Sequence, residues 1–132
     1  MPSITVPDYS GRSLPNLVAE LETRLTGSAV FAPLHTDLAA DIPEASTYVL
    51  VVFDGLGDQQ LSHPAAQPLM DARVAAIDAP FPTTTTVSLA TIATGLPPSQ
   101  HGLLGYQSWF PEVDTVVNTI KWTTLWGDAV DY

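Results

Sequence analysis

Two groups of side chains in the sequence have the types and positions that chemistry at a metal ion or a phosphate requires. The first centres on Asp54, which directly follows an apolar run and precedes Gly55 and Gly57. Glycines at such a point let backbone and ligand approach closely, so the carboxylate is suited to bind a divalent cation. Aspartate and glycine are equally typical of an ordinary turn after a strand, and the local sequence leaves both interpretations open. Asp58 is expected to be a solvated or helix-capping carboxylate.

The second group is a run of four threonines at residues 83–86. A hydroxyl at a helix N-terminus lies beside unpaired N–H groups and the positive end of the helix dipole, which suits phosphate binding or stabilisation of an alkoxide. Plain capping is the more common use of such residues. A threonine becomes a nucleophile only where a base or a metal lowers its pKa, so the run by itself does not decide between capping and catalysis.

Other residues suited to metal binding are sparse. His35, His63 and His101 do not form an HxH, HxxxH or HExxH motif, and the sequence contains no cysteine. Each histidine is therefore expected to be structural. The three tryptophans are expected in packing rather than in base stacking.

The first element expected to support these residues is a helix that follows an irregular arm at residues 1–12. Ser13 is suited to cap it and Gly27 to end it, and Glu20 and Arg24 form a supporting pair four residues apart. Helical spacing predicts that the helix packs along one apolar stripe, which consists of Leu14, Leu17, Val18, Leu21 and Leu25.

The segment TYVLVVFD at 47–54 is apolar on both faces, the pattern of a central strand in a parallel sheet that is covered on both sides. Such a strand delivers Asp54 to the edge where open α/β sheets bind ligands. A short helix is expected at 64–72 and a second short strand at 74–77.

A buried helix is predicted from the threonine run to Thr94, closed by Gly95. QSWF (107–110) and TVVNTI (115–120) predict two further short strands, joined across 111–114. The predicted fold class is α/β, as a partial α/β/α sandwich with a mostly parallel and incomplete central sheet.

Composition limits the kinds of protein that this can be. The chain has 132 residues, 45% hydrophobic and 14% charged, enough for one hydrophobic core but not for two ordinary domains. Its net charge is −10 with only four basic residues, which excludes nucleic-acid binding by charge and argues against an anionic membrane surface. No secretory signal and no run long enough to span a bilayer are visible, so a soluble, cytoplasmic globular chain is expected.

Taken together, VLVVFDGLGD (49–58) and FPTTTTVSLATIATGLPPSQHGLLGY (81–106) resemble the alkaline phosphatase superfamily, in its type I phosphodiesterase and nucleotide pyrophosphatase branch. TGLPPSQHG (94–102) is the most specific part of the likeness, and NTIKW (118–122) also resembles a segment of bacterial members. The resemblance implies an alkaline-phosphatase-like fold, of which residues 13–132 form the N-terminal portion of a single phosphodiesterase catalytic domain.

The resemblance also implies metal-dependent hydrolysis of phosphodiester or nucleotide pyrophosphate bonds through a phosphothreonine intermediate. Asp54 matches the first aspartate ligand of the family. Thr85, nine positions before Thr94, matches the nucleophile, which also contacts the metal; a slip of one residue would place it at Thr84 or Thr86. The implied cofactors are two divalent ions, Zn²⁺ with Mn²⁺ as the alternative, and the implied substrate is a small phosphate ester or nucleotide.

Ser88 stands where many nucleotide pyrophosphatases carry an asparagine that holds phosphate, so Ser88 and Thr86 are expected to bind substrate, and the substrate itself stays open. His101 matches a family motif without being a metal ligand. The remaining family ligands come from later in the chain, whereas no histidine follows Trp122.

The sequence therefore predicts a fragment, the front portion of an enzyme, inactive as an isolated chain. Two alternatives stay open. One is a non-catalytic remnant or interaction module of the same scaffold, prone to self-association. The other is a phosphomonoesterase or phosphomutase of the same superfamily.

Overall fold

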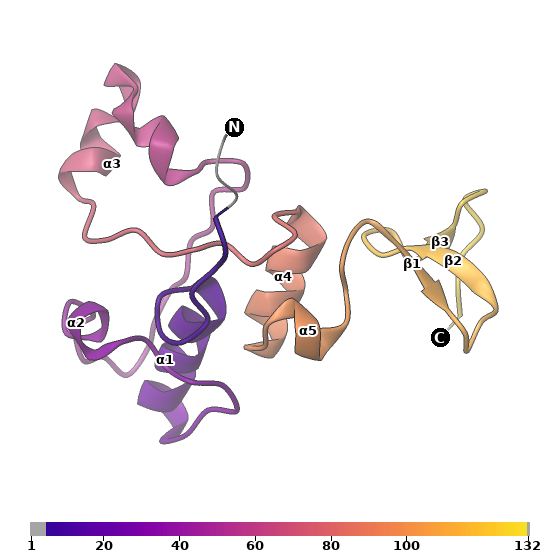
Figure 1. The fold of residues 1–132 in the computed structure, drawn as a ribbon, viewed down its shortest axis with the longest axis horizontal. Coiled ribbons are helices and arrows are strands. Elements are labelled where there is room, and N and C mark those ends of the chain that lie inside the picture. Colours follow the sequence, from indigo (N-terminus) through magenta and orange to yellow (C-terminus); the bar gives the residue numbers. More distant parts are fainter. Residues whose placement is uncertain (1–4, 132) are drawn as a thin grey trace.

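The structure is a computed structural model that describes residues 5–131. Helices occupy one end of an elongated molecule and a small sheet occupies the other (Figure 1). The helices are α1 (Leu14–Thr26), α2 (Thr36–Ala39), α3 (Gln67–Asp71), α4 (Thr85–Thr94) and α5 (Pro98–His101). Two 3₁₀ turns, η1 (Asp58–Ser62) and η2 (Pro64–Ala66), precede α3. The strands are β1 (Gln107–Phe110), β2 (Thr115–Asn118) and β3 (Thr123–Thr124).

Helix α1 has the ends that the sequence predicts. Ser13 lies at its N-cap and Gly27, with a left-handed φ of 86°, ends it. At the N-terminus, Asn16 Oδ1 accepts hydrogen bonds from the backbone N–H of Ser13 at 3.1 Å and from its hydroxyl at 2.5 Å. The predicted pair also forms, with Arg24 Nε 2.6 Å from Glu20 Oε1. Local capping and pairing thus define this helix.

The buried face of α1 differs from the prediction. The apolar stripe is at most half-buried, and Leu25 is 51% exposed. The helix instead buries Pro15, Asn16, Ala19 and Glu20. Hydrogen bonds to later residues explain why this polar face is buried. Asn16 Nδ2 donates to the Ala32 carbonyl. Arg24, the partner of Glu20, donates to the Ala39 carbonyl. These hydrogen bonds draw the loop that follows the helix over its polar side.

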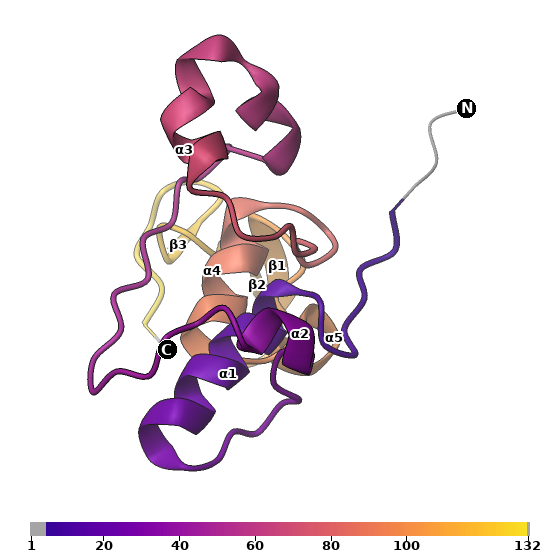
Figure 2. The same cartoon turned by 90° about the vertical axis from the view of Figure 1, so that its left-hand side faces the viewer.

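Helix α4 confirms the helix predicted after the threonine run, although its buried part is smaller than expected. Val87 is fully buried, whereas Leu89 on the same helix is 54% exposed. Gly95 ends the helix with a φ of 67°, and a Cβ added there would lie 3.6 Å from Val18 Cγ1. This close approach packs α1 against α4, and α5 packs on α4 in turn, whereas the α3 region projects away from them (Figure 2).

The two strands predicted near the C-terminus are confirmed as β1 and β2. They pair antiparallel with Gln107 opposite Asn118 and Phe110 opposite Thr115, and β3 extends the sheet on the other side of β2. Val117 in β2 is fully buried. Short connections make these pairings local, which is why periodicity and the turn between the strands were enough to predict them.

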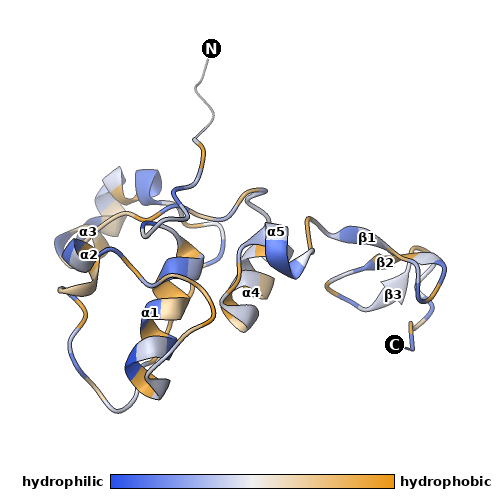
Figure 3. Ribbon diagram, turned by 60° about the horizontal axis from the view of Figure 1, so that its bottom comes forward, coloured by the Kyte–Doolittle hydropathy of each residue, from blue (hydrophilic) through white to orange (hydrophobic). Residues whose placement is uncertain are grey.

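The strands predicted at 47–54 and 74–77 are not formed, and the sheet in residues 5–131 is antiparallel where a mostly parallel one was expected. A strand exists only where a neighbouring backbone pairs with it, and the described chain offers 47–54 none. Its apolar side chains are therefore exposed, Val49 to 84% and Phe53 to 60%, and hydrophobic residues line extended segments as well as helices (Figure 3). A single parallel bridge joins Ser13 to Asp78.

The short helix predicted at 64–72 is present as η2 followed by α3. Within residues 5–131, no helix is both long enough and apolar enough to cross a membrane.

Candidate active site

Asp54 and Thr85, the two residues that the sequence singles out for chemistry, lie together in the structure. Thr85 Oγ1 donates a hydrogen bond to Asp54 Oδ2 at 3.0 Å, across 31 positions of sequence. Thr85 is the first residue of α4, and Gly55, with a φ of 75°, turns the chain directly after Asp54. The first helical hydrogen bond is donated by Ser88 N–H to the Thr84 carbonyl at 3.0 Å, so the preceding N–H groups stand free of the helix ladder.

A third side chain, Tyr106, joins this pair. Its hydroxyl lies 3.1 Å from Thr85 Oγ1 and donates to it. The backbone that bears Tyr106 is fixed from β2, because Thr119 N–H donates to the Tyr106 carbonyl at 2.9 Å and Thr119 Oγ1 donates to the Gly105 carbonyl at 2.7 Å. The sheet thus holds the phenol against the start of α4.

Sequence reasoning missed Tyr106. The residue lies inside the segment that carries the family resemblance, four positions after the HG pair at 101–102, and that position is the signal that was present. A single tyrosine has no spacing that connects it with a threonine 21 residues earlier, so its contact becomes visible only in three dimensions.

The neighbouring threonines differ from Thr85 in their surroundings. Thr84 Oγ1 and Thr86 Oγ1 are buried, and neither has a hydrogen-bond partner in the described part of the chain. Of the three hydroxyls at the helix start, the contact with Asp54 is made by Thr85. Ser88 is half-buried one turn further along α4.

His101 has the structural hydrogen bonds that the sequence predicts. Its Nδ1 accepts from Leu103 N–H at 3.1 Å, and its Nε2 lies 3.2 Å from Thr91 Oγ1. Since Nδ1 accepts, the neutral ring carries its proton on Nε2 and donates it to Thr91. Burial lowers the pKa of His101 below its usual value, which favours this neutral form. The ring thereby ties the end of α5 to the buried side of α4.

The arginines lie in ion pairs away from Thr85. Arg12 pairs with Asp37 at 2.5 Å, Arg24 with Glu20 at 2.6 Å, and Arg73 with Asp58 at 2.5 Å. Asp58, expected to be solvated or capping, is the first residue of η1, and the hydrogen bond from Arg73 lowers its carboxyl pKa. Hydrogen bonds with His35 and then Arg12 lower the pKa of Asp37 to about 2. The side chains that hydrogen-bond Thr85 Oγ1 are therefore Asp54 and Tyr106, and none of these arginine pairs includes either of them.

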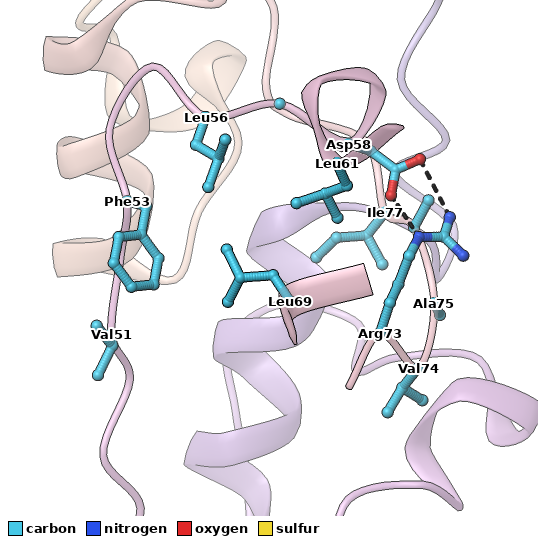
Figure 4. A pocket seen from close by; sticks show the side chains of 12 residues that line it. Val51, Phe53, Leu56, Asp58, Leu61, Leu69, Arg73, Val74, Ala75 and Ile77 are labelled. Carbon is cyan, nitrogen blue, oxygen red and sulfur yellow. Dashed lines mark hydrogen bonds and ion pairs between the residues drawn. The ribbon is translucent and has the colours of Figure 1, made fainter. Parts of the chain in front are cut away.

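A hollow of about 540 Å³ lies apart from this cluster. Figure 4 shows its apolar walls, with Val51 and Phe53 on one side, Ile77 on the other and the Asp58–Arg73 pair at its rim. Asp54, Thr85 and Tyr106 are not among its lining residues. The two segments predicted to be parallel strands thus face each other across a hollow instead of pairing.

The described residues do not by themselves fit a two-metal centre. No group of three or more His, Asp or Glu side chains within residues 5–131 is placed to hold a metal ion. Asp54 and Thr85 together supply two neighbouring oxygen donors, and a catalytic zinc ion typically takes three protein ligands. The structure therefore shows that the two predicted metal ligands lie close together, but residues 5–131 do not supply a complete ligand set.

A hydroxyl at a helix start that faces a carboxylate is compatible with a covalent nucleophile, and it is equally compatible with a helix cap. The model of one protein family, type I phosphodiesterase / nucleotide pyrophosphatase, matches residues 48–129, well over half of the chain. The chain belongs to this family, as the sequence motifs indicated, and the family implies a hydrolase domain that acts on phosphodiester or pyrophosphate bonds and uses divalent metal ions. No curated protein and no solved structure matches the chain.

Proposed function

We propose that this chain carries the nucleophile part of a metal-dependent phosphodiesterase or nucleotide pyrophosphatase, with Thr85 as the nucleophile. The observation that carries the proposal is the 3.0 Å hydrogen bond from Thr85 Oγ1 to Asp54 Oδ2 at the N-terminus of α4, inside the segment that the family model matches. Thr84 and Thr86 have no such carboxylate partner among the described residues, which supports Thr85 over either neighbour.

In the proposed reaction, Thr85 Oγ1 attacks the phosphorus atom of a small phosphate ester or nucleotide. The Thr85 proton passes to Asp54 Oδ2, its hydrogen-bond acceptor, and from there to the leaving oxygen. The Oγ1–P bond forms while the bond from phosphorus to that oxygen breaks, and water later hydrolyses the phosphothreonine and returns Thr85 to its hydroxyl form. The free N–H groups at the start of α4 suit the non-bridging oxygens. Ser88, half-buried on the first turns of the same helix, is the proposed substrate-binding hydroxyl, and Thr86, whose Oγ1 is buried, would join it only if its side chain turned outward.

The family match, more than the charges near Thr85, supports a diester over a monoester substrate. A phosphate monoester carries about two negative charges near pH 7 and a diester carries one, so a monoester places the larger demand on positive charge. Each of the three arginines pairs with a carboxylate elsewhere. Because the proposal assigns the positive charge to metal ions whose other ligands lie outside residues 5–131, this distribution leaves the phosphomonoesterase or phosphomutase alternative open.

The family supports the proposed metal dependence, and no ligand set in residues 5–131 adds to that support. Zn²⁺, or alternatively Mn²⁺, would neutralise the phosphate charge, and Asp54 and Thr85 would contribute two of its ligands. We propose that the other ligands lie outside this chain, so that the chain alone is inactive. In the same proposal, residues 13–132 form one portion of the catalytic domain, and 47–54 joins an alkaline-phosphatase-like parallel sheet, which its exposed apolar residues support.

These exposed residues also favour one second function, that of an interaction module. Val49 is 84% exposed and Val51 65%, in a segment whose backbone is extended and outside any ladder. Unpaired apolar segments promote association with another chain, so self-association is the proposed outcome for the isolated chain.

Hydrolysis of bis(p-nitrophenyl) phosphate with Zn²⁺ or Mn²⁺ tests the proposal, on this chain and on any longer product of its native reading frame. We expect negligible turnover by the 132-residue chain and weak zinc binding in calorimetry, reduced further by Asp54→Asn. In an active longer product, Thr85→Ala should abolish turnover, whereas the matched change Thr83→Ala, at an exposed position outside the helix, should keep it. Full activity of Thr85→Ala would refute the nucleophile assignment.

A further inference from the structure

Two hydrogen bonds use most of the hydrogen-bonding capacity of the Thr85 hydroxyl. A threonine hydroxyl has one proton and two lone pairs. The proton is directed to Asp54 Oδ2 at 3.0 Å, and one lone pair accepts the Tyr106 hydroxyl at 3.1 Å. One lone pair is left, and loss of the proton frees another, so that one can face a metal ion and the other can form the bond to phosphorus.

We propose that Tyr106 is a positioning residue for the nucleophile, a role that rests on the proposed function of Thr85. Its phenol O–H donates to Oγ1, whose own proton is directed to Asp54, and the two contacts together set the direction in which the remaining lone-pair density points. As a donor, the phenol also stabilises the negative charge that develops on Oγ1 as the Thr85 proton leaves.

The backbone of Tyr106 is held in place by hydrogen bonds from the segment that follows β2. The carbonyls of Gly105 and Tyr106 are both held by Thr119, at 2.7 Å through its hydroxyl and at 2.9 Å through its N–H. Thr119 directly follows β2, whose Val117 is fully buried in the small sheet. The sheet therefore fixes Tyr106, and Tyr106 reaches across to α4, which gives the C-terminal sheet a part in the site.

The rotamer of Thr85 makes the proposal testable. Threonine in a helix divides between two χ1 rotamers, because its hydroxyl can also bond the carbonyl of the preceding turn. Thr85 is the first helical residue, so it has no preceding helical turn and depends on Asp54 and Tyr106 for its orientation. Loss of Tyr106 should release it.

The experiment measures the three-bond couplings of the Thr85 methyl carbon in the 132-residue chain by NMR. We expect one χ1 rotamer in the wild type and two in Tyr106→Phe. The control Tyr48→Phe also removes a phenol hydrogen bond, to the Pro43 carbonyl, and should leave Thr85 unchanged. Couplings of the buried Thr91 report whether α4 stays folded. Unchanged Thr85 couplings in a folded Tyr106→Phe variant would overturn the positioning role.

A second measurement tests the same contact without changing Tyr106, in case the Tyr106→Phe variant does not fold. With 3-fluorotyrosine incorporated, Thr85→Val should shift the ¹⁹F resonance of Tyr106 by more than its linewidth, and Thr83→Val, at an exposed position, should not. Equal spectra for the two variants would equally overturn the contact.

The two proposals fail in different ways. In an active longer product, Tyr106→Phe should lower kcat up to about tenfold, the value of one hydrogen bond, with KM unchanged. If Thr85→Ala stays active, the proposed function falls although the spectroscopic coupling stands. If the coupling is missing while Thr85→Ala is inactive, the positioning role falls and the proposed function stands.

Discussion

Asn16 offers the sharpest test of how this small fold is held together. The residue is 0% exposed and takes part in four hydrogen bonds. Its Oδ1 accepts from the N–H and the hydroxyl of Ser13, and its Nδ2 donates to the carbonyls of Tyr9 at 3.0 Å and Ala32 at 2.9 Å. One amide thus joins the N-terminal arm, the start of α1 and the loop after it.

The cost of Asn16→Ala follows from these contacts. Each hydrogen bond contributes about 1 kcal/mol net, and the buried Ser13 N–H, left without a partner, adds about 1–3 kcal/mol. Water that enters the vacated space offsets part of this, so we expect a loss of about 3–5 kcal/mol in the free energy of unfolding. Domains of this kind are stable by about 5–15 kcal/mol in total, so the variant should be largely destabilised.

Urea unfolding followed by circular dichroism at 222 nm measures this loss, because α1 is the longest helix. The matched control is Asn118→Ala, the same change at a half-buried position where Oδ1 accepts two N–H groups at 3.1 Å and the amide N–H groups donate to no carbonyl of residues 5–131. We expect about 2 kcal/mol there, from two hydrogen bonds and no buried group left unpaired. An equal effect of the two variants would refute the view that Asn16 organises the N-terminal half.

Three further predictions concern pH, the exposed segment and a helix end. Because burial lowers the pKa of His101, the unfolded chain binds a proton at this residue at a higher pH than the folded chain does. The contribution of His101 to stability is therefore full above about pH 6.5 and falls as the pH drops towards the folded pKa. Urea midpoints should be lower at pH 5.5 than at pH 7.5, and His101→Gln should reduce this difference. Val51→Lys should change the unfolding free energy by less than about 0.5 kcal/mol and reduce self-association in size-exclusion chromatography, whereas a large loss would show that 47–54 is buried. Gly95→Ala should cost about 1–2 kcal/mol, because its φ of 67° is unfavourable for a side chain, and an unchanged melting temperature would contradict this.

Helices α1 and α4 were predictable because their signals are local, whereas the short α2 (Thr36–Ala39) and α5 (Pro98–His101) were not predicted. Ser13 and Gly27 mark the ends of α1, and the threonine run and Gly95 mark those of α4, where the structure places them. The buried face of α1 was not predictable, because it depends on hydrogen bonds from Asn16 to residues up to 16 positions away. Apolar spacing identifies the face that would gain most from burial, and polar partners decided which face the loop covers.

The strands divide in the same way. β1 and β2 follow each other across a short turn and were predicted together, because the partner of each lies in the next segment. The segment 47–54 has the stronger β pattern, but a parallel pair needs a partner from a distant part of the sequence. The pattern shows that the segment is suited to a sheet, but it does not show whether a partner strand is present. The absence of pairing in residues 5–131 could therefore not be predicted from this pattern alone.

The candidate site contains both residues that the sequence predicted and one that only the structure revealed. Family motifs indicated Asp54 and Thr85, and the structure brings them within 3.0 Å; the third member, Tyr106, was found from the contact itself. The three groups orient a hydroxyl, but they carry one negative charge and no positive one, in a chain of net charge −10. A phosphate ester approaching Thr85 therefore meets repulsion from Asp54 until cations reverse the local sign. Orientation by Tyr106 and charge neutralisation by metal ions are separable requirements, so the NMR experiment on Thr85 can detect the first in a chain that lacks the second.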